Sequence, residues 1–458
     1  MSAAPGVFAP APAIRSAGFT TLGCKVNTFE TGLIKQTIAA AGVDVESTVG
    51  ADLHIINTCT VTGEADRQAR QAVRRAVRGN PDALVIVTGC YAQMSPEACA
   101  AIPGVDLVLG NGRKLDVHNL LPQLAAGRLP KVMVDNLDAQ VSLPRQLLTG
   151  CNGRARAFMQ VQQGCDQGCT FCIIHRARGP SRSLPPALVR RQAGRLLLGG
   201  YRELVVCGVD LGAWGRDLAP AADGRRHDFA GLLRGVAGLR GDFRLRLSSL
   251  DPAHLGPQLA RLWGRHEKIC PHLHLSMQSG SDLILKRMKR RCSRGEMLER
   301  VHALREEAPA LTVSADIMTG FPTETESQFT ETVDAVRELK IAWPHVFPYS
   351  ARPGTPAARI PRQVPPAERR RRAAIIRKTA AGIRRQLHQS QLGRRLRVLA
   401  ETPTRARAAN YITVTLPQSL GAAAGEFLTV DITEAGEDCV AAGGVLNSAP
   451  AGDKKCSP

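Results

Sequence analysis

The chain has 458 residues, of which 44% are hydrophobic, and a formal net charge of +20. This length predicts two to four domains, and the absence of any run of about eighteen apolar residues argues against a membrane-spanning helix. The charge favours a polyanionic partner such as a nucleic acid, although a general bias toward Arg and Ala would also produce it.

The first seventeen residues are rich in Ala and Pro and lack the basic start and long apolar run of a secretory signal. We therefore expect a cytoplasmic protein with no membrane partner. The chain contains 13 cysteines. Because cytosolic thiols are kept reduced, the cysteines that cluster are expected to bind metal or act in catalysis, not to form disulfides.

The first third of the chain alternates apolar runs with helical patterns. The runs at 18–24, 51–59 and 83–90 read as strands, and each ends in a cysteine. Residues 64–78 place small apolar residues on one face and arginines on the other, which predicts a surface helix. Strand, helix and strand in this order predict a Rossmann-like parallel α/β domain at 18–125. A weakly patterned linker at 126–150 follows.

A second alternation extends over 151–385. Six strand-like runs separated by helix-like text predict a partial (β/α)6 barrel, in which the chemistry lies at the carboxyl ends of the strands. Small or polar residues gather at or near those ends: Gly208, Asp210, Ser248, Ser249, Gln278, Ser279, Asp316 and Tyr349. The runs themselves are 156–162, 203–209, 243–250, 272–278, 311–318 and 343–349.

The pattern changes at 351–366, where five prolines occur. A strongly basic helix is predicted at 367–391. Short runs rich in β-branched residues then indicate a small all-β module at 390–446.

One motif in the barrel region concentrates three cysteines. In "GCDQGCTFC", Cys165, Cys169 and Cys172 have the spacing C-x-x-x-C-x-x-C, and no fourth cysteine follows closely. Zinc is an alternative, since His175 is nearby, but structural zinc sites generally use a second ligand pair. Three thiolates at this spacing can hold an iron–sulfur cluster with one iron lacking a protein ligand.

The triplet, placed after the first barrel strand, resembles the radical S-adenosylmethionine superfamily. The resemblance implies that its cysteines hold a 4Fe-4S cluster whose open iron binds S-adenosylmethionine. It further implies reductive cleavage of this cofactor to a 5′-deoxyadenosyl radical, which abstracts hydrogen from a C–H bond. It also suggests cofactor contacts from the following residues, each of which could instead have only a structural role at the barrel rim: Gly208, Asp210, Ser248, Gln278 and Asp316.

Three further cysteines, Cys24, Cys59 and Cys90, end the three strands predicted near the amino terminus. The carboxyl ends of parallel strands meet at one edge of a sheet, so these cysteines are expected to converge. Burial as small apolar residues is the alternative. The segments "TLGCKVNTFET", "INTCTVTGEADRQ" and "VTGCYAQ" resemble the amino-terminal domain of methylthiotransferases. This resemblance implies a second, auxiliary 4Fe-4S cluster on these cysteines.

The resemblance extends from about residue 18 to about residue 446 and includes a C-terminal module similar to a TRAM RNA-binding domain, an OB-like β fold. Within the family, "LGCKVN", "LHLSMQSGSDLILKRM" and "HVFPYSARPGTPAA" are most similar to the branch that modifies N6-threonylcarbamoyladenosine. The alternatives are the branches that modify isopentenyladenosine in tRNA or an aspartate of a ribosomal protein. Three residues depart from the branch pattern: His175, Arg176 and Thr323.

The implied reaction replaces the C2 hydrogen of adenosine 37, in the anticodon stem-loop of tRNA, with a methylthio group. It uses two molecules of S-adenosylmethionine, a sulfur donor and an electron donor of unidentified nature, and no catalytic residues beyond the cluster ligands. A non-catalytic iron–sulfur protein that binds RNA is a further alternative.

The basic helix is expected to bind RNA phosphates, with a solvated arginine-rich face as the alternative. Tyr411 and Phe427 could stack on bases or belong to the core of the β module. The predicted phosphate contacts are Arg369, Arg370, Arg371, Arg372, Arg377, Lys378, Arg384 and Arg385.

Overall fold

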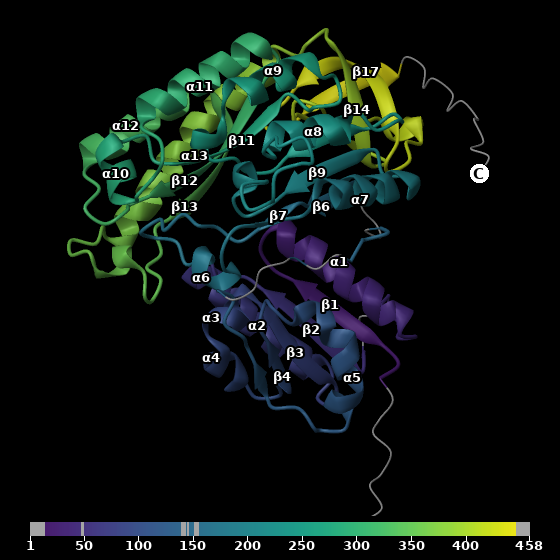
Figure 1. Cartoon of the computed structure of the whole chain (residues 1–458). Helices are drawn as coiled ribbons and strands as arrows, with labels where there is room; N and C mark the ends of the chain where they lie inside the picture. Colours follow the sequence, from purple (N-terminus) through teal and green to yellow (C-terminus); the bar gives the residue numbers. More distant parts are fainter. Residues whose placement is uncertain (1–13, 47–49, 139–142, 144–145, 151–154, 446–458) are drawn as a thin grey trace, which may run out of the picture.

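The computed structural model describes residues 14–46, 50–138, 143, 146–150 and 155–445. Figure 1 shows an amino-terminal α/β unit below a larger unit of strands and outer helices, with a small β unit at the far side of the latter. This arrangement confirms the predicted α/β class with an additional all-β module. The predicted domain boundaries stay predictions.

The amino-terminal unit is built on a five-stranded parallel sheet in which the strands lie in chain order. The first three strands match the predicted runs, so the sequence located them correctly. The strands are β1 (Ala17–Thr21), β2 (Leu53–Thr58), β3 (Leu84–Gly89), β4 (Leu107–Leu109) and β5 (Val132–Met133).

Helices cover both faces of this sheet. The alternation of strand side chains explains why: Ile55 packs with α1 and α5, whereas its neighbour Ile56 packs with α2 on the opposite face. The predicted surface helix is α2, which begins after Thr62, whose side chain accepts a hydrogen bond from the Ala65 amide. The helices are α1 (Lys25–Ala40), α2 (Gly63–Gly79), α3 (Cys90–Met94), α4 (Pro96–Ala100), η1 (Lys114–Asp116) and α5 (Val117–Ala125).

The central unit contains two three-stranded parallel sheets, β6-β9-β10 and β11-β12-β13. Two isolated parallel bridges, Leu245 to Ile269 and Leu250 to Leu275, connect them. Six parallel strands therefore follow one another in chain order, as the six predicted βα repeats require. They are β6 (Arg156–Gln160), β9 (Glu203–Cys207), β10 (Arg244–Leu247), β11 (His272–Gln278), β12 (Thr312–Thr319) and β13 (Ile341–Pro348).

Helices lie along the outside of these strands (Figure 1). The long ones are α7 (Pro186–Leu198), α8 (Phe229–Ala237), α9 (Pro257–Arg265), α11 (Arg294–Glu307), α12 (Glu326–Glu338) and α13 (Pro366–Gln389). The shorter elements are β7 (Gln162–Gln163), α6 (Ile174–Arg178), β8 (Arg182–Ser183), η2 (Leu211–Ala213), η3 (Pro252–His254), α10 (Asp282–Arg287) and η4 (Pro356–Arg359).

The C-terminal unit is a closed five-stranded barrel. Two of its strands, β15 and β18, lie outside the three predicted runs, because they are rich in Ala or Gly and carry a weak β signal. Its elements are β14 (Arg395–Thr402), β15 (Arg405–Ala408), β16 (Thr413–Thr415), η5 (Gln418–Leu420), β17 (Phe427–Ala435) and β18 (Val440–Val445).

This small barrel docks on the amino ends of the central strands. Arg244 and Arg246 of β10, held by the buried carboxylate of Glu203, donate hydrogen bonds to the carbonyls of Arg407 and Ala408. The ring of Tyr411 stacks on His272, with 4.2 Å between the ring centroids. Arg244 and Arg397 both lie over the ring of Phe427. Both rings therefore contribute to the contact between the β module and the central unit, which favours the alternative that they have a structural role.

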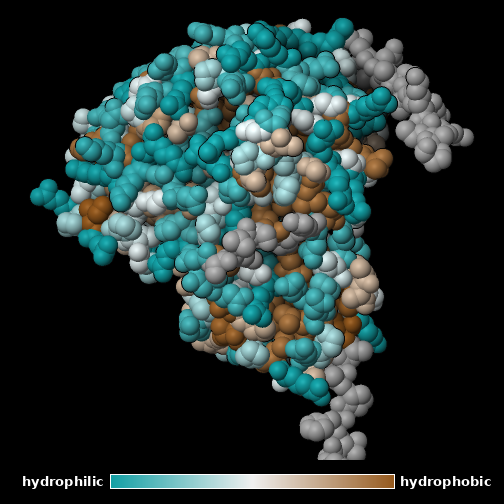
Figure 2. All heavy atoms as spheres, viewed as in Figure 1, coloured by the Kyte–Doolittle hydropathy of each residue, from teal (hydrophilic) through white to brown (hydrophobic). Residues whose placement is uncertain are grey.

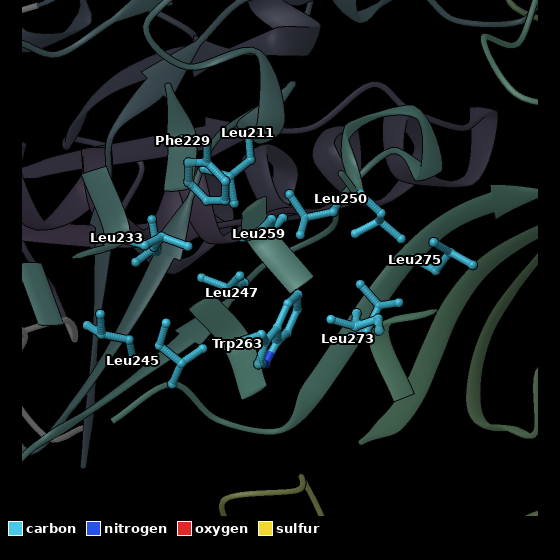
Figure 3. Close-up of a cluster of buried hydrophobic side chains, with 14 of the residues drawn as sticks. Leu211, Phe229, Leu233, Leu245, Leu247, Leu250, Leu259, Trp263, Leu273 and Leu275 are labelled. Atoms are coloured by element: carbon cyan, nitrogen blue, oxygen red, sulfur yellow. The ribbon is translucent and has the colours of Figure 1, made fainter. Parts of the chain in front are cut away.

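The hydrophobic core of the central unit joins the strands to their covering helices. In Figure 3, leucines of β10 and β11 meet Phe229 of α8 and Trp263 of α9. Figure 2 shows hydrophilic side chains over much of the helical exterior on the visible face. No helix among the described residues has the length and hydropathy needed to cross a membrane.

Replacing Leu245 with Ala should test this core. Leu245 is fully buried on β10, so the cavity left behind should lower the free energy of unfolding by about 2–5 kcal/mol, measured by urea denaturation. Leu198→Ala is the control, because Leu198 is 90% exposed, and it should change stability by less than about 0.5 kcal/mol. Equal effects of both substitutions would contradict the assigned packing.

Candidate active site

The cysteine triplet lies on the loop between β7 and α6, beyond the carboxyl end of the first barrel strand. Gly164 has φ +74°, and a Cβ there would lie 1.8 Å from the carbonyl oxygen of Pro180, so only glycine fits. The amide of Gln167 donates to the Cys165 sulfur, and that of Ile174 donates to the Cys172 sulfur, both at 3.4 Å. Amides directed at sulfur suit thiolate ligands of a metal cluster.

The three sulfurs line one cavity of about 180 Å³. Asp210, predicted to contact the cofactor, lies on its wall with one carboxylate oxygen 3.8 Å from the Cys165 sulfur. Arg291 and His254 hold this carboxylate at 2.6 and 3.0 Å. Burial alone would raise the pKa of Asp210, but hydrogen bonds from His254 and Arg291 lower it below its ordinary range. The cavity therefore has an ionised carboxylate on its wall.

The same cavity is also lined by Arg290, whose guanidinium lies 3.6 Å from the Cys169 sulfur and 2.8 Å from the carboxylate of Asp251. Gln278 also lines this cavity. Its φ of +68° occurs where the pairing register of β11 shifts. The bulge turns the chain at the end of the strand and brings this side chain to the cavity.

The other three cysteines converge as predicted. Cys24, Cys59 and Cys90 line a second cavity of about 190 Å³, although they are far apart in the sequence. Gly23 permits their approach, because a Cβ at this residue would lie 2.9 Å from the Cys59 sulfur. Burial, together with Cys90 and Cys24, raises the pKa of Cys59 to about 12. A free thiol there is neutral at pH 7, and its ionisation requires compensation such as metal binding.

The central unit forms the other side of this second cavity. Gly208 and Ser248, predicted as S-adenosylmethionine contacts, line it, and so does Cys207 at the end of β9. The structure therefore places these two residues with the distributed cysteines, whereas Asp210 and Gln278 lie with the triplet.

A third cavity, of about 210 Å³, lies beside the first two. Asp316, the remaining predicted cofactor contact, lines it together with Gln278 and Cys172. Its carboxylate lies 3.0 Å from His274 and 3.6 Å from His345. Ile174 lines all three cavities, so the two cysteine sets open on adjoining spaces.

A buried charge network joins the two cysteine-bearing units. Arg178 of α6 is 1% exposed and makes a bidentate pair with Glu30 of α1, with distances of 2.8 and 3.2 Å. It also donates to Asn27, whose amide oxygen lies 3.9 Å from the Cys24 sulfur. Lys114 lies 2.5 Å from Oε2 of Glu30, which it shares with Arg178. Although burial would raise the pKa of Glu30, Arg178 and Lys114 lower it, so the carboxylate is ionised.

Asn111 extends this network to the third distributed cysteine. Its side-chain amide donates to the carbonyl of Ala177 on α6 at 2.6 Å and lies 3.9 Å from the Cys90 sulfur. The network therefore contacts residues beside two of the three distributed cysteines and the helix that follows the triplet. Sequence reasoning missed Arg178, Asn111, Arg290 and Arg291, because each is positioned by a contact with a distant segment.

The predicted phosphate contacts on α13 differ in their availability. Arg372 is buried and pairs with Glu324 and Glu368, so it was wrongly assigned to RNA. Arg369 is also occupied, since it donates to the carbonyls of Tyr349 and Val364. Arg371, Arg384 and Arg385 pair with carboxylates. The exposed residues with no carboxylate partner among the described residues are Arg370, Arg377 and Lys378.

Two of the three departures from the family pattern, His175 and Arg176, lie within α6, and none of the three lines the three cavities. Burial lowers the pKa of His175, and Arg176 lowers it further, so His175 is neutral at pH 7. Thr323 has φ +69°, a conformation that favours glycine, and its hydroxyl accepts a hydrogen bond from Arg287.

Comparison with known proteins agrees with the division of the chain into an amino-terminal unit and a central unit. Residues 16–110 match the model described as "Uncharacterized protein family UPF0004", and residues 159–336 match the radical SAM superfamily. The threonylcarbamoyladenosine tRNA methylthiotransferase MtaB of Rickettsia prowazekii is 40% identical over 403 residues, which cover 87% of this chain and 91% of the relative. The chain belongs to the radical S-adenosylmethionine methylthiotransferases, in the MtaB branch.

Two further relatives and one solved structure are also similar to this chain. The protein of the same name from Bacillus subtilis is 41% identical and covers 76% of both chains. A tRNA-2-methylthio-N(6)-dimethylallyladenosine synthase of Sorangium cellulosum is 36% identical and covers 76% of this chain and 74% of the relative. Among solved structures, the radical S-adenosylmethionine methyltransferase TsrM of Kitasatospora setae has a TM-score of 0.57 at 15% identity, covering 76% and 77% of the two chains. This last likeness concerns the fold.

Substitution of Arg178 should test the network between the units. Arg178→Met removes the bidentate partner of a buried carboxylate, which should lower the free energy of unfolding by about 3–5 kcal/mol, measured by urea denaturation. Arg113→Met is the matched control, because the Arg113–Asp135 pair is about half exposed, and it should stay within about 1 kcal/mol of the parent protein. A parent-like stability of Arg178→Met would show that the pair does not hold the units together.

Proposed function

We propose that this chain is a tRNA methylthiotransferase that replaces the C2 hydrogen of N6-threonylcarbamoyladenosine 37 with a methylthio group. The observation that carries the proposal is the presence of two three-cysteine sets on adjoining cavities, with Ile174 on the wall of each. One set offers a place to generate a radical, and the other offers a place from which sulfur is transferred. An adenine bound where these cavities adjoin would be within reach of both sets.

The donor sets fit two iron–sulfur clusters. Each cavity collects three thiols, which are soft ligands suited to iron. Cys165, Cys169 and Cys172 would hold the cluster that binds S-adenosylmethionine, and Cys24, Cys59 and Cys90 would hold the auxiliary cluster. When bound, the two clusters supply an electron for S-adenosylmethionine cleavage on one side and the sulfur for transfer on the other. The sulfur source and the reductant come from outside this chain.

The protein residues around the triplet prepare a polar binding wall. The carboxylate of Asp210 is held in place by Arg291 and His254 and suits a hydroxyl or ammonium donor of the cofactor. Gln278 offers an amide on the same wall. Gly208 and Ser248 line the cavity of the distributed cysteines, so we assign them to the boundary between cofactor and substrate. Asp316 faces the third cavity, where the nucleoside would enter.

The choice of substrate is supported by the relatives. The proteins that are 40% and 41% identical carry the name of the threonylcarbamoyladenosine enzyme, whereas the named dimethylallyladenosine enzyme is 36% identical. The named substrates are all tRNA. We therefore favour the threonylcarbamoyl branch over the isopentenyl branch.

Helix α13 supports tRNA binding by its position. Arg369 near its start contacts the carbonyl of Tyr349, just beyond the end of β13, and Arg384 near its end contacts Asp438 of the β module. The helix has 24 residues, which corresponds to about 36 Å. Arg370, Arg377 and Lys378 thus form a basic track between the candidate active site and the β module.

Nucleoside mass spectrometry of tRNA tests the proposed reaction. Cells lacking this protein should lose 2-methylthio-N6-threonylcarbamoyladenosine, and the intact gene should restore it. Cys169→Ala should fail to restore it, because the triplet loses a cluster ligand. Cys292→Ala is the control, since Cys292 is a buried core residue of the same unit.

Anaerobically purified protein should contain about eight irons per chain, as two cubane clusters require. Restoration of the methylthio group on isopentenyladenosine alone would assign the chain to the other tRNA branch. Full activity of Cys169→Ala would contradict the proposed radical mechanism.

The basic track can be tested by the salt dependence of tRNA binding. Replacing Arg370, Arg377 and Lys378 together with Gln should reduce the slope of log Kd against log salt by about 2 to 3, if each contacts one phosphate. Arg371→Gln serves as the control, because Glu326 and Glu368 already pair with Arg371. An unchanged slope in the triple variant would assign the track to a solvated surface.

A further inference from the structure

The three adjoining cavities are lined by four cationic side chains, and three of these are paired with carboxylates. Arg290 pairs with Asp251, Arg291 with Asp210, and Arg178 with Glu30. The fourth is Lys25, on the wall that carries the distributed cysteines. Within the described part of the chain, no hydrogen bond or ion pair is present at its ammonium group. Lys25 is therefore the cation that these walls leave available to a ligand.

The position of Lys25 is fixed by the fold. It is the first residue of α1 and directly follows Cys24, so its stem starts beside the distributed cysteines. Lys25 also acts electrostatically on two residues of the central unit, because its charge contributes to lowering the pKa values of Asp316 and His345. Asp316 lines the third cavity. The cavity that Lys25 lines shares Val61 and Ile174 with the cavity that contains Asp316, so Lys25 lies on the wall of a space that adjoins that of Asp316.

Helix stability does not explain a lysine here. A positive charge at the amino end of a helix opposes the helix dipole, and the first turn of α1 contains no acidic residue that would compensate it. Lys25 is half-buried, so its ammonium is partly withdrawn from water. An unpaired, partly desolvated cation in this place gains most from an anionic ligand.

The proposed substrate has one anionic group besides its phosphates. The threonylcarbamoyl group on N6 of the adenine ends in a free carboxylate, whereas an isopentenyl group is an uncharged hydrocarbon. Resting on the proposed function, we infer that Lys25 binds the carboxylate of the threonylcarbamoyl group and selects this modified adenosine.

The other titratable groups near Asp316 are less suited than Lys25 to bind the substrate carboxylate. His274 and His345 face Asp316, and burial lowers the pKa of His345 so that it is neutral at pH 7. Asp316 is an anion and repels a second carboxylate unless a cation lies between them. The ammonium of Lys25 can supply this cation. A substrate carboxylate bound to Lys25 would be shielded from the charge of Asp316.

The test compares anticodon stem-loops that carry either N6-threonylcarbamoyladenosine or unmodified adenosine at position 37. Binding to the anaerobically reconstituted full chain is measured by fluorescence anisotropy, with the Kd for each stem-loop. Lys25→Met should weaken binding of the modified stem-loop about tenfold to a hundredfold, as expected for loss of a charge-assisted hydrogen bond. Binding of the unmodified stem-loop should not change, and Lys25→Arg should recover part of the loss.

Lys35→Met is the matched control on the same helix, because Lys35 lies over the ring of Phe19 and lines a different cavity. Iron content should match the parent protein in every variant. An unchanged preference of Lys25→Met for the modified stem-loop would overturn the inference, and so would equal weakening for both stem-loops, which would place Lys25 on the RNA backbone. If the parent protein methylthiolates isopentenyladenosine and not the threonylcarbamoyl substrate, the proposed function itself fails, whatever the variant does.

Discussion

The buried contact between Arg178 and Glu30 is the constraint on which the candidate active site depends. It joins α6, which follows the cysteine triplet, to α1, which follows Cys24. Lys114 is a second buried partner of Glu30, and loss of Arg178 would leave the buried network with unbalanced charge, which is costly. The two cysteine sets therefore keep a fixed mutual position, and three cavities open beside one another at Ile174. If the two cysteine sets held clusters, this fixed spacing would keep the site of radical formation and the site of the sulfur within reach of one adenosine.

The sequence was sufficient for the first three strands, for the six strands of the central unit and for the convergence of the distributed cysteines, for a physical reason. Parallel strands bring their carboxyl ends to one edge, so cysteines that end successive strands must converge. The repeat of strand and helix was visible without any long-range information. The Arg178–Glu30 pair was not visible, because its partners are 148 residues apart and neither belongs to a local pattern. Lys25 could be predicted only in part from the sequence. Its position after Cys24 was evident, but the lack of a partner at its ammonium group became evident only from the structure.

Charge composition illustrates the limit of sequence reasoning more sharply. The basic helix was predicted correctly, but the eight cations assigned to RNA proved to be of different kinds. Arg372 is buried against Glu324, and Arg371 pairs with Glu326, which belongs to the neighbouring helix α12. A net charge of +20 states how many cations exceed the anions, and it does not state which of them are already neutralised. Only tertiary contacts separate structural arginines from those available to phosphate.

The amino ends of the central strands contact the β module, and their carboxyl ends form the candidate active site. This separation raises the question of how one RNA could reach the cavities. The β module occupies the amino ends, where Arg244 and Arg246 bind its carbonyls. The amino-terminal unit covers the carboxyl ends, where all three cavities lie. An RNA held by the β module would be remote from the chemistry if nothing connected the two ends. Helix α13 makes this connection along the side of the barrel, and its unpaired cations lie between the two ends. If α13 binds RNA as proposed, affinity would be provided along this helix, and selection of the nucleoside would fall to the few side chains at the cavities.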